Sequence, residues 1–222
     1  MSLQPDTPPA LEIAAGHGRV TRILAIRHGE TDWNAQQRLQ GHTDIPLNAL
    51  GVAQAQRLAD ALAAEPLDAI HSSDLLRARQ TAEPAARALG LGVRLHEGLR
   101  ERAFGEFEGQ TYAQIEARWP VAALAWRRRD PDFAAPGGET LLAFQARCVA
   151  AVMELAAEAE GQAIAIVAHG GVLDMLYRAA SRVGLQAPRS WQLSNAAVNR
   201  LLLTDAGLML VGWNDCQHLE GL

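Results

Sequence analysis

Three short, mostly apolar runs along this chain each stop at a cluster of polar residues. Runs of this kind are typical of buried β-strands that end in loops. They cover residues 22–26, 67–70 and 163–168. Two further apolar runs, 197–203 and 208–213, lie on either side of a turn sequence that ends in glycine, and this pattern predicts an antiparallel hairpin.

Between the first three strands and the hairpin, apolar residues recur at three- and four-residue spacing, which is the helical pattern. Helices are predicted over residues 49–64, 74–89 (with a break near Pro84), 141–160 and 172–183. Strands that alternate with helices predict an α/β fold, a three-layer sandwich in which helices flank a mixed, mostly parallel central sheet. The carboxyl ends of parallel strands gather at one edge of such a sheet, and ligands bind there.

The length of 222 residues fits a single domain. We expect this domain over residues 20–222, after a flexible N-terminal extension, residues 1–19, which has no signal-peptide pattern. Residues 102–139 are rich in glycine and proline around short helical pieces such as 112–119. This composition predicts an access or lid segment that lies over the strand ends and shapes what can enter.

Composition narrows the class of partner. The formal net charge of -5 argues against a broad nucleic-acid surface, and no apolar stretch approaches the ~18 residues of a membrane span. Cys148 and Cys216 lie far apart, without a paired spacing. These features predict a cytoplasmic protein, monomer or homodimer, that binds a small molecule rather than a nucleic acid or a membrane.

The candidate chemistry lies at the strand ends. Arg27, His28 and Gly29 follow the first predicted strand, and His169 with Gly170 follows the run 163–168. Because parallel strands end at the same edge of the sheet, the two imidazoles can converge on one point. A single histidine is more often a packed or exposed residue, so the pairing is what carries the functional interpretation.

Arginines near the same edge predict an anion site. Arg27 precedes His28, and Arg77 lies at the start of a predicted helix, whose free N–H groups also favour an anion. Planar guanidinium groups suit phosphoryl oxygens, although a helix arginine can also be part of a solvated face. A metal centre is the competing interpretation, but His28 and His169 lack acidic partners at ligand spacing and the arginines would repel a cation. We therefore expect neither a metal nor another cofactor.

These residues fall within five ordered sequence blocks. Together the blocks make the chain similar to the histidine phosphatase superfamily, which includes the cofactor-dependent phosphoglycerate mutases. The resemblance covers residues 22–218 and implies a phosphoglycerate mutase-like fold. The blocks are Arg27-His-Gly-Glu-Thr31; Ser73-Asp74 with Arg77-Ala78 and Gln80-Thr-Ala82; Leu99-Arg-Glu-Arg-Ala-Phe-Gly-Glu-Phe-Glu-Gly109; Pro136-Gly-Gly-Glu-Thr140; and Ala168-His-Gly-Gly171.

The resemblance implies a role for each matched residue. His28 attacks phosphorus and carries the phosphoryl group as a phosphohistidine, and His169 assists it. Glu101 protonates the leaving oxygen and then activates water, with Glu30 and Glu139 as less certain alternatives. Phosphate binding is assigned to Arg27, Arg77, Asn34 and Gly170, and the candidates for contacts with the rest of the substrate are Thr31, Gln40, His42 and Arg102.

Three functions are compatible with these residues, and the second acceptor of the phosphoryl group separates the first two. Phe104 stands where the mutase branch usually has tyrosine, and the insert that follows is short, so water is favoured as acceptor and the chain is predicted to be a phosphomonoester hydrolase. The runner-up is a phosphoglycerate mutase, for which the triplet 127–129 of arginines could clamp a second anion; a solvated helix end is the favoured interpretation of that triplet. A catalytically inactive phosphate-binding regulatory module is the third interpretation, and the retained nucleophile, acid and arginines argue against it.

Overall fold

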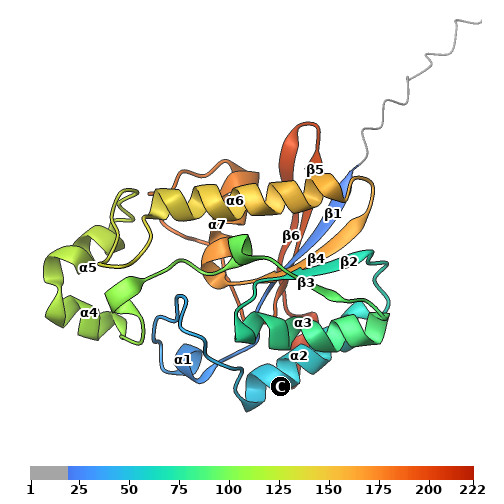
Figure 1. Cartoon of the computed structure of the whole chain (residues 1–222), viewed down its shortest axis with the longest axis horizontal. Helices are drawn as coiled ribbons and strands as arrows, with labels where there is room; N and C mark the ends of the chain where they lie inside the picture. The colour runs from blue at the N-terminus through green and yellow to red at the C-terminus, as the bar shows by residue number, and fades with distance from the viewer. Residues whose placement is uncertain (1–19) are drawn as a thin grey trace, which may run out of the picture.

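The computed structural model describes residues 20–222, so the predicted extension at 1–19 lies outside the described residues. One six-stranded sheet with the order β3-β2-β4-β1-β5-β6 forms its centre (Figure 1). Neighbours among β1 to β4 pair in parallel, and β5 pairs antiparallel with both β1 and β6. The predicted mixed, mostly parallel sheet is confirmed. The strands are β1 (Thr21–Arg27), β2 (Ala69–Ser72), β3 (Val93–Leu95), β4 (Ala163–Ala168), β5 (Val198–Thr204) and β6 (Gly207–Asp215).

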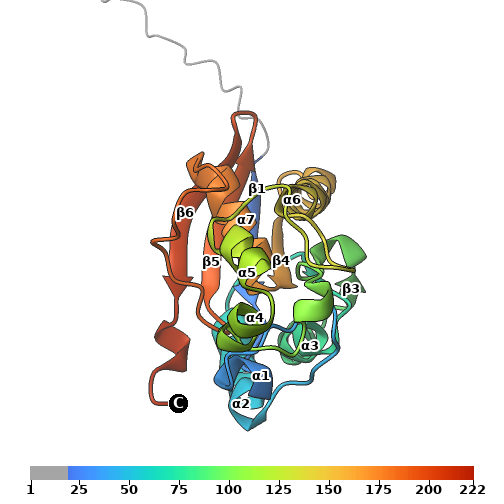
Figure 2. The ribbon, with the colours of Figure 1, turned by 90° about the vertical axis from the view of Figure 1, so that its left-hand side faces the viewer.

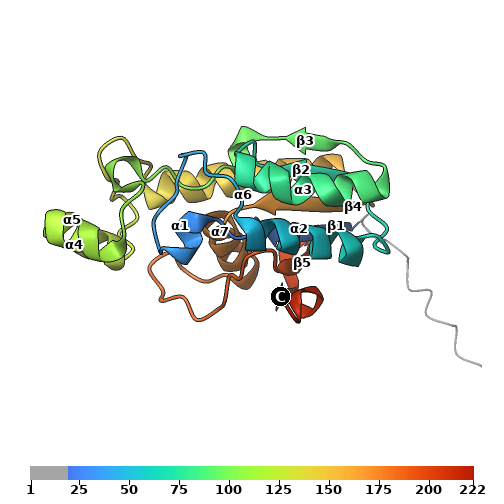
Figure 3. The same ribbon diagram turned by 90° about the horizontal axis from the view of Figure 1, so that it is seen from below.

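Helices cover both faces of the sheet. Figure 3, seen from below, shows α2 and α3 side by side in front of the sheet, with α6 and α7 on its far face. Polar residues at the predicted starts begin two of these helices, because the side chains of Asn48 and Thr140 accept hydrogen bonds from free N–H groups of the first turn. The helices are α1 (Asp32–Ala35), α2 (Ala49–Leu62), α3 (Leu76–Leu89), α4 (Tyr112–Arg118), α5 (Pro120–Arg127), α6 (Leu141–Glu158) and α7 (Gly170–Ser181), with short 3-10 turns η1 (Glu97–Leu99), η2 (Gly105–Phe107) and η3 (Gln217–Leu219).

The alternation of side chains along β1 explains the three layers. Ile23 and Ala25 belong to the core under α6 and α7, whereas Leu24 and Ile26 belong to the core under α2 and α3. Successive side chains of a strand point to opposite faces, so a strand that is apolar throughout needs helices on both sides. The three-layer α/β sandwich is therefore confirmed.

Two elements differ from the predicted pattern. The break expected near Pro84 is wrong, because α3 runs through this residue. Alanines on its inner face, among them Ala82, Ala85 and Ala86, are buried against the sheet, and this packing offsets the hydrogen bond that proline cannot donate. Strand β3 was not predicted, since its three residues are too few to show a period.

The segment 102–139 forms a separate lobe. Figure 1 shows α4 and α5 at the left-hand end, away from the sheet, and in Figure 2 they lie in front of it. The lobe has its own small core, built around Phe107, Ile115 and Ala123. In the part of the chain described, 20–222, no helix combines the length and apolar character that crossing a membrane requires.

Candidate active site

The pairing of β1 with β4 brings the two histidines together. The strands run parallel with Arg27 opposite Ala168, so the next residue of each strand, His28 and His169, leaves the sheet at the same point. The backbone N–H of His28 donates to the carbonyl of Ala168 at 2.9 Å. The two ring centroids are 5.2 Å apart, and both side chains are buried. The two imidazoles therefore converge at the strand ends, as predicted.

A backbone contact fixes the tautomer of His28. Its Nδ1 lies 2.7 Å from the carbonyl oxygen of Gly29, and because a carbonyl only accepts, Nδ1 must carry the proton. The lone pair of the neutral ring is then on Nε2. Burial, followed by the positive charges of Arg77 and Arg27, lowers the pKa of His28 well below its ordinary value, so the ring is neutral at physiological pH.

Two arginines reach this point from different elements. Arg27, at the end of β1, donates from Nη1 to the carbonyl of Leu193, and Arg77, in the first turn of α3, donates to the carbonyls of Gly41 and Thr43 at 2.8 and 3.0 Å. Arg77 is completely buried, and burial lowers its pKa to about 10, so it keeps its charge at neutral pH. The Nε atoms of both arginines are buried without a partner among residues 20–222.

His169 and Gly170 mark the start of α7. Neither ring nitrogen of His169 has a hydrogen-bond partner within the described chain, and burial, then the charge of Arg77, lowers the pKa of His169 well below its usual range. Buried polar atoms are almost always paired in native proteins, so unpaired nitrogens beside His28 point to a bound group. A Cβ on Gly170 would lie 3.4 Å from Nε of Arg27, an ordinary van der Waals contact, so Gly170 lies directly beside the guanidinium.

Backbone N–H groups orient the carboxylate of Glu101. Its Oε1 accepts from the N–H of Arg102 at 2.9 Å, and its Oε2 accepts from the N–H of Gly171 at 3.0 Å. A Cβ on Gly171 would lie 2.1 Å from Oε1, so only glycine allows this approach. The candidate acid is thus fixed beside the start of α7, one residue from Gly170.

The side chains of Thr31 and Asn34 mainly hold the loop after β1. They form a capping box around α1, in which each side chain binds the backbone of the other residue. Oδ1 of Asn34 accepts these bonds, which leaves its Nδ2 as the donor available to an anion. Asn195, which sequence reasoning missed, donates from Nδ2 to the carbonyl of His28 at 2.9 Å.

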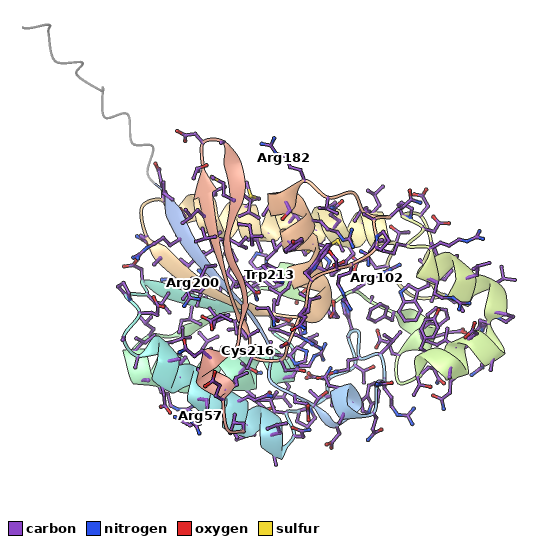
Figure 4. The ribbon with its side chains drawn as sticks, turned by 180° about the vertical axis from the view of Figure 1, so that it is seen from behind. Arg57, Arg102, Arg182, Arg200, Trp213 and Cys216 are labelled. Carbon is purple, nitrogen blue, oxygen red and sulfur yellow. The ribbon has the colours of Figure 1, made fainter. Side chains whose placement is uncertain are left out.

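The other predicted substrate contacts differ in their surroundings. Gln40 is buried with its Oε1 unpartnered among residues 20–222, and exposed His42 binds the carbonyl of Glu101 through Nε2 at 2.8 Å. Arg102 is buried and donates to the carbonyls of Glu139 and Phe133, so its guanidinium ties the acid block to the lobe. Figure 4 shows Arg102 between the sheet and α4–α5.

The alternative acids have partners elsewhere. Oε1 of Glu30 accepts from Asn48 at 2.9 Å, and Glu139 forms an ion pair with Arg147 at 2.8 Å. Glu108, which sequence reasoning did not single out, accepts hydrogen bonds from four groups, including N and Oγ1 of Thr43. This carboxylate holds the loop whose carbonyls bind Arg77.

The arginine triplet is only partly a solvated helix end. Arg127 pairs with Glu116, and Arg128 is exposed at the end of α5. Arg129 instead binds Asp174 of α7 at 2.7 Å. Within residues 20–222 there is no group of three or more His, Cys, Asp or Glu side chains that could hold a metal ion.

The combined geometry suits a tetrahedral anion. A neutral imidazole offers its Nε2 lone pair, two arginines and a second imidazole can surround three oxygens, and a carboxylate lies nearby to move a proton. Charge-assisted contacts from guanidinium groups in a buried site favour phosphoryl groups in particular.

Known proteins are similar to this chain in sequence and fold. Residues 23–216 match the family model of the histidine phosphatase superfamily (branch 1). Phosphoglycerate mutase-like protein 4 of Arabidopsis thaliana is 37% identical over 202 residues, which cover 89% of this chain and 86% of that protein. The metal-independent phosphoserine phosphatase of the same plant is 34% identical over 206 residues, 91% of this chain and 85% of that protein.

A solved structure has the same fold. The mycobacterial glucosyl-3-phosphoglycerate phosphatase, solved in complex with VO3, superposes with a TM-score of 0.79 at 35% identity. The match covers 87% of this chain and 99% of that one.

Proposed function

The chain belongs to branch 1 of the histidine phosphatase superfamily, and we propose that it hydrolyses a small phosphomonoester through a phosphohistidine on His28. One observation carries the proposal. His28 is buried and neutral, its Nδ1 proton is bound to the carbonyl of Gly29, and its Nε2 is left with a lone pair beside Arg27, Arg77 and His169. This is the arrangement that nucleophilic attack on phosphorus needs.

In the first step, Nε2 of His28 forms a bond to phosphorus while the bond between phosphorus and the ester oxygen breaks. Glu101 gives its proton to that oxygen, so the alcohol leaves neutral. Arg27, Arg77 and His169 bind the three remaining oxygens and stabilise the charge of the transition state. The product of this step is a phosphohistidine and a free alcohol.

In the second step, water attacks the phosphohistidine. Glu101, now a carboxylate, takes a proton from the water as the oxygen bonds to phosphorus, and the bond to Nε2 breaks. Phosphate leaves, and His28 and Glu101 return to their starting states. Asn34 and Gly170 complete the phosphate site in this proposal, through Nδ2 of Asn34 and through the position of Gly170 beside Arg27 at the start of α7.

The substrate is a small phosphorylated metabolite. The relatives named above are called a phosphoserine phosphatase and a glucosyl-3-phosphoglycerate phosphatase, and both names denote small phosphomonoesters. The lobe 102–139 shapes substrate access in this proposal, and Arg102 fixes it to the acid block. His42, bound to the carbonyl of Glu101, and the buried residues Thr31 and Gln40 are the remaining candidates for contacts with the substrate. The enzyme acts as a monomer or homodimer in the cytoplasm, where its two free cysteines stay reduced.

Transfer back to another hydroxyl, as in a mutase, is the second candidate. The name of the mutase-like relative favours it. The arginine triplet offers it little support, because Arg127 and Arg129 are paired with Glu116 and Asp174, which leaves Arg128 as the one triplet arginine without an ion pair within residues 20–222. Within the described chain the triplet therefore offers one free cation for a second phosphate, and we favour water as the acceptor.

Two assays separate the candidate functions. The hydrolase should release phosphate from a chromogenic phosphomonoester in excess chelator, since arginines supply the positive charge that a metal supplies elsewhere. It should isomerise phosphoglycerate far more slowly, with or without a bisphosphorylated primer. Faster isomerisation than hydrolysis would establish the mutase. The absence of turnover in both assays would favour the catalytically inactive phosphate-binding module.

A further inference from the structure

A cavity of about 500 Å³ opens beside the candidate acid. Arg27, Gly170 and Gly171 form its inner wall. Its outer wall is the loop between α7 and β5, with Arg189 and the residues Trp191, Gln192, Leu193 and Ser194. This volume is that of a small-molecule site, and its inner wall is shared with the phosphoryl site.

The mechanism directs the leaving group towards this cavity. Glu101 must reach the ester oxygen to protonate it, and Oε2 of Glu101 lies 3.0 Å from the N–H of Gly171. Gly171 lines the cavity. The carbon skeleton attached to the ester oxygen therefore extends from the acid into the space in front of Arg189.

Arg189 brings an uncompensated positive charge to this space. The side chain is exposed and forms no ion pair with a carboxylate among residues 20–222. Its charge reaches the phosphoryl site: burial lowers the pKa of Arg27, and the positive charge of Arg189 lowers it further. The indole N–H of Trp191, beside it, is buried and lacks an acceptor within the described chain.

The loop that carries Arg189 is held on both sides. Before it, Arg178 donates to the carbonyls of Gly184 and Ala187, at 2.5 and 3.0 Å. After it, Trp191 stacks on Tyr177 with ring centroids 4.0 Å apart. The indole of Trp213, labelled in Figure 4, also donates to the carbonyl of Gln192 at 2.8 Å. A loop fixed in this way presents Arg189 at a set position and lowers the cost of ordering a ligand there.

We propose that this cavity is a second anion subsite, in which Arg189 binds a carboxylate carried by the leaving alcohol of the substrate. The substrate class is then a phosphomonoester of a small hydroxy acid. This inference rests on the proposed function, since the position of the leaving group follows from the roles of His28 and Glu101. The planar fork of arginine matches a carboxylate, and exposure keeps the contribution moderate.

The test compares two esters that differ in the carboxylate alone, phosphoserine and phosphoethanolamine. The measured quantity is the ratio of their kcat/KM values in the wild type, Arg189→Gln, Arg189→Lys and Arg57→Gln. Arg57 is exposed on α2, away from Arg102 in Figure 4, and is the matched control. We expect the ratio to fall about fivefold in Arg189→Gln, to recover in part in Arg189→Lys, and to stay at the wild-type value in Arg57→Gln.

An unchanged ratio in Arg189→Gln would overturn the subsite while the hydrolase stands. If the wild type hydrolyses neither these two esters nor the chromogenic phosphomonoester, the proposed function fails. Equilibrium binding of phosphoserine and phosphoethanolamine then tests the subsite on its own. Tighter binding of phosphoserine than of phosphoethanolamine that disappears in Arg189→Gln supports it. Equal binding of the two esters to the wild type refutes it.

Discussion

At the scale of single residues, His28 and Glu101 each depend on backbone groups for their state. The carbonyl of Gly29 sets which nitrogen of His28 can attack, and two N–H groups hold the carboxylate of Glu101. Side chains fixed by the backbone lose little freedom when a substrate binds. Their contribution therefore falls on the chemical steps rather than on binding.

Glu101→Gln tests the acid role through the leaving group. An alkyl oxygen leaves poorly without a proton, whereas nitrophenolate leaves without one. We expect the variant to slow phosphorylation by an alkyl phosphate about a hundredfold or more, and to slow phosphorylation by nitrophenyl phosphate much less. Single-turnover measurement is required, because the second step also uses this carboxylate. Equal losses for both substrates would transfer the acid role to Glu30 or Glu139.

Whether the sequence predicts a site residue depends on the element that carries the residue. His28 and His169 were predictable because each follows a strand, and parallel strands end together. Asn195 and Arg189 were not, because they lie in a loop without a period. The bond from Asn195 to His28 spans 167 residues of sequence, and Arg189 lines the same cavity as Arg27, the last residue of β1. Only the folded chain brings them to the site.

At the scale of elements, the loop 41–43 determines the position of Arg77. Its carbonyls bind Arg77, and the carboxylate of Glu108 accepts hydrogen bonds from His42, Thr43 and Phe104 that hold the loop in place. Glu108 thereby positions Arg77 through this loop.

Glu108→Gln should lower both stability and turnover. The amide of glutamine would point a donor at one of the present donors, and the loss of these bonds should cost about 1–3 kcal/mol of unfolding free energy. Displacement of Arg77 should lower kcat more than it raises KM, because the arginine stabilises the transition state. Exposed Glu106, two residues away, gives the matched control Glu106→Gln. A stable variant with normal kcat would show that the loop holds Arg77 without Glu108.

The elements themselves were predictable to different extents. The longer helices show a clear helical period, and β1 and β4 are continuous apolar runs. All of them lie within a few residues of their predicted bounds. The break at Pro84 was wrong because tertiary packing of the alanine face outweighs a local propensity. The roles of Arg102 and Arg129 depend on contacts between the lobe and the sheet, which no local pattern records.

At the scale of the whole molecule, the buried histidines link the site to stability. Burial lowers the pKa values of His28 and His169 well below 6.5, with the charge of Arg77 next in effect for both. In the unfolded chain both rings regain ordinary values and bind protons below about pH 6.5. Above that pH neither state binds these protons, so the histidines have no effect there. Below it the unfolded state is favoured.

We therefore expect the unfolding free energy to fall as the pH drops from 6.5 towards 5.5. Each of the two histidines contributes up to about 1.4 kcal/mol per pH unit to this slope. Urea unfolding of the wild type and of His169→Gln at several pH values measures it, and the variant should show the shallower slope. Parallel pH profiles for the two proteins would contradict the neutral, buried state of His169.

The proposed mechanism requires a phosphohistidine on His28. Brief mixing with a substrate labelled in its phosphoryl group, followed by denaturation without acid, should trap the label on His28, because the bond from phosphorus to nitrogen survives these conditions. His28→Ala should lose the adduct and should lower turnover by roughly four orders of magnitude. His96→Ala, a histidine outside the site, should keep both. Label found on serine or aspartate, or a His28→Ala variant with normal turnover, would contradict the mechanism.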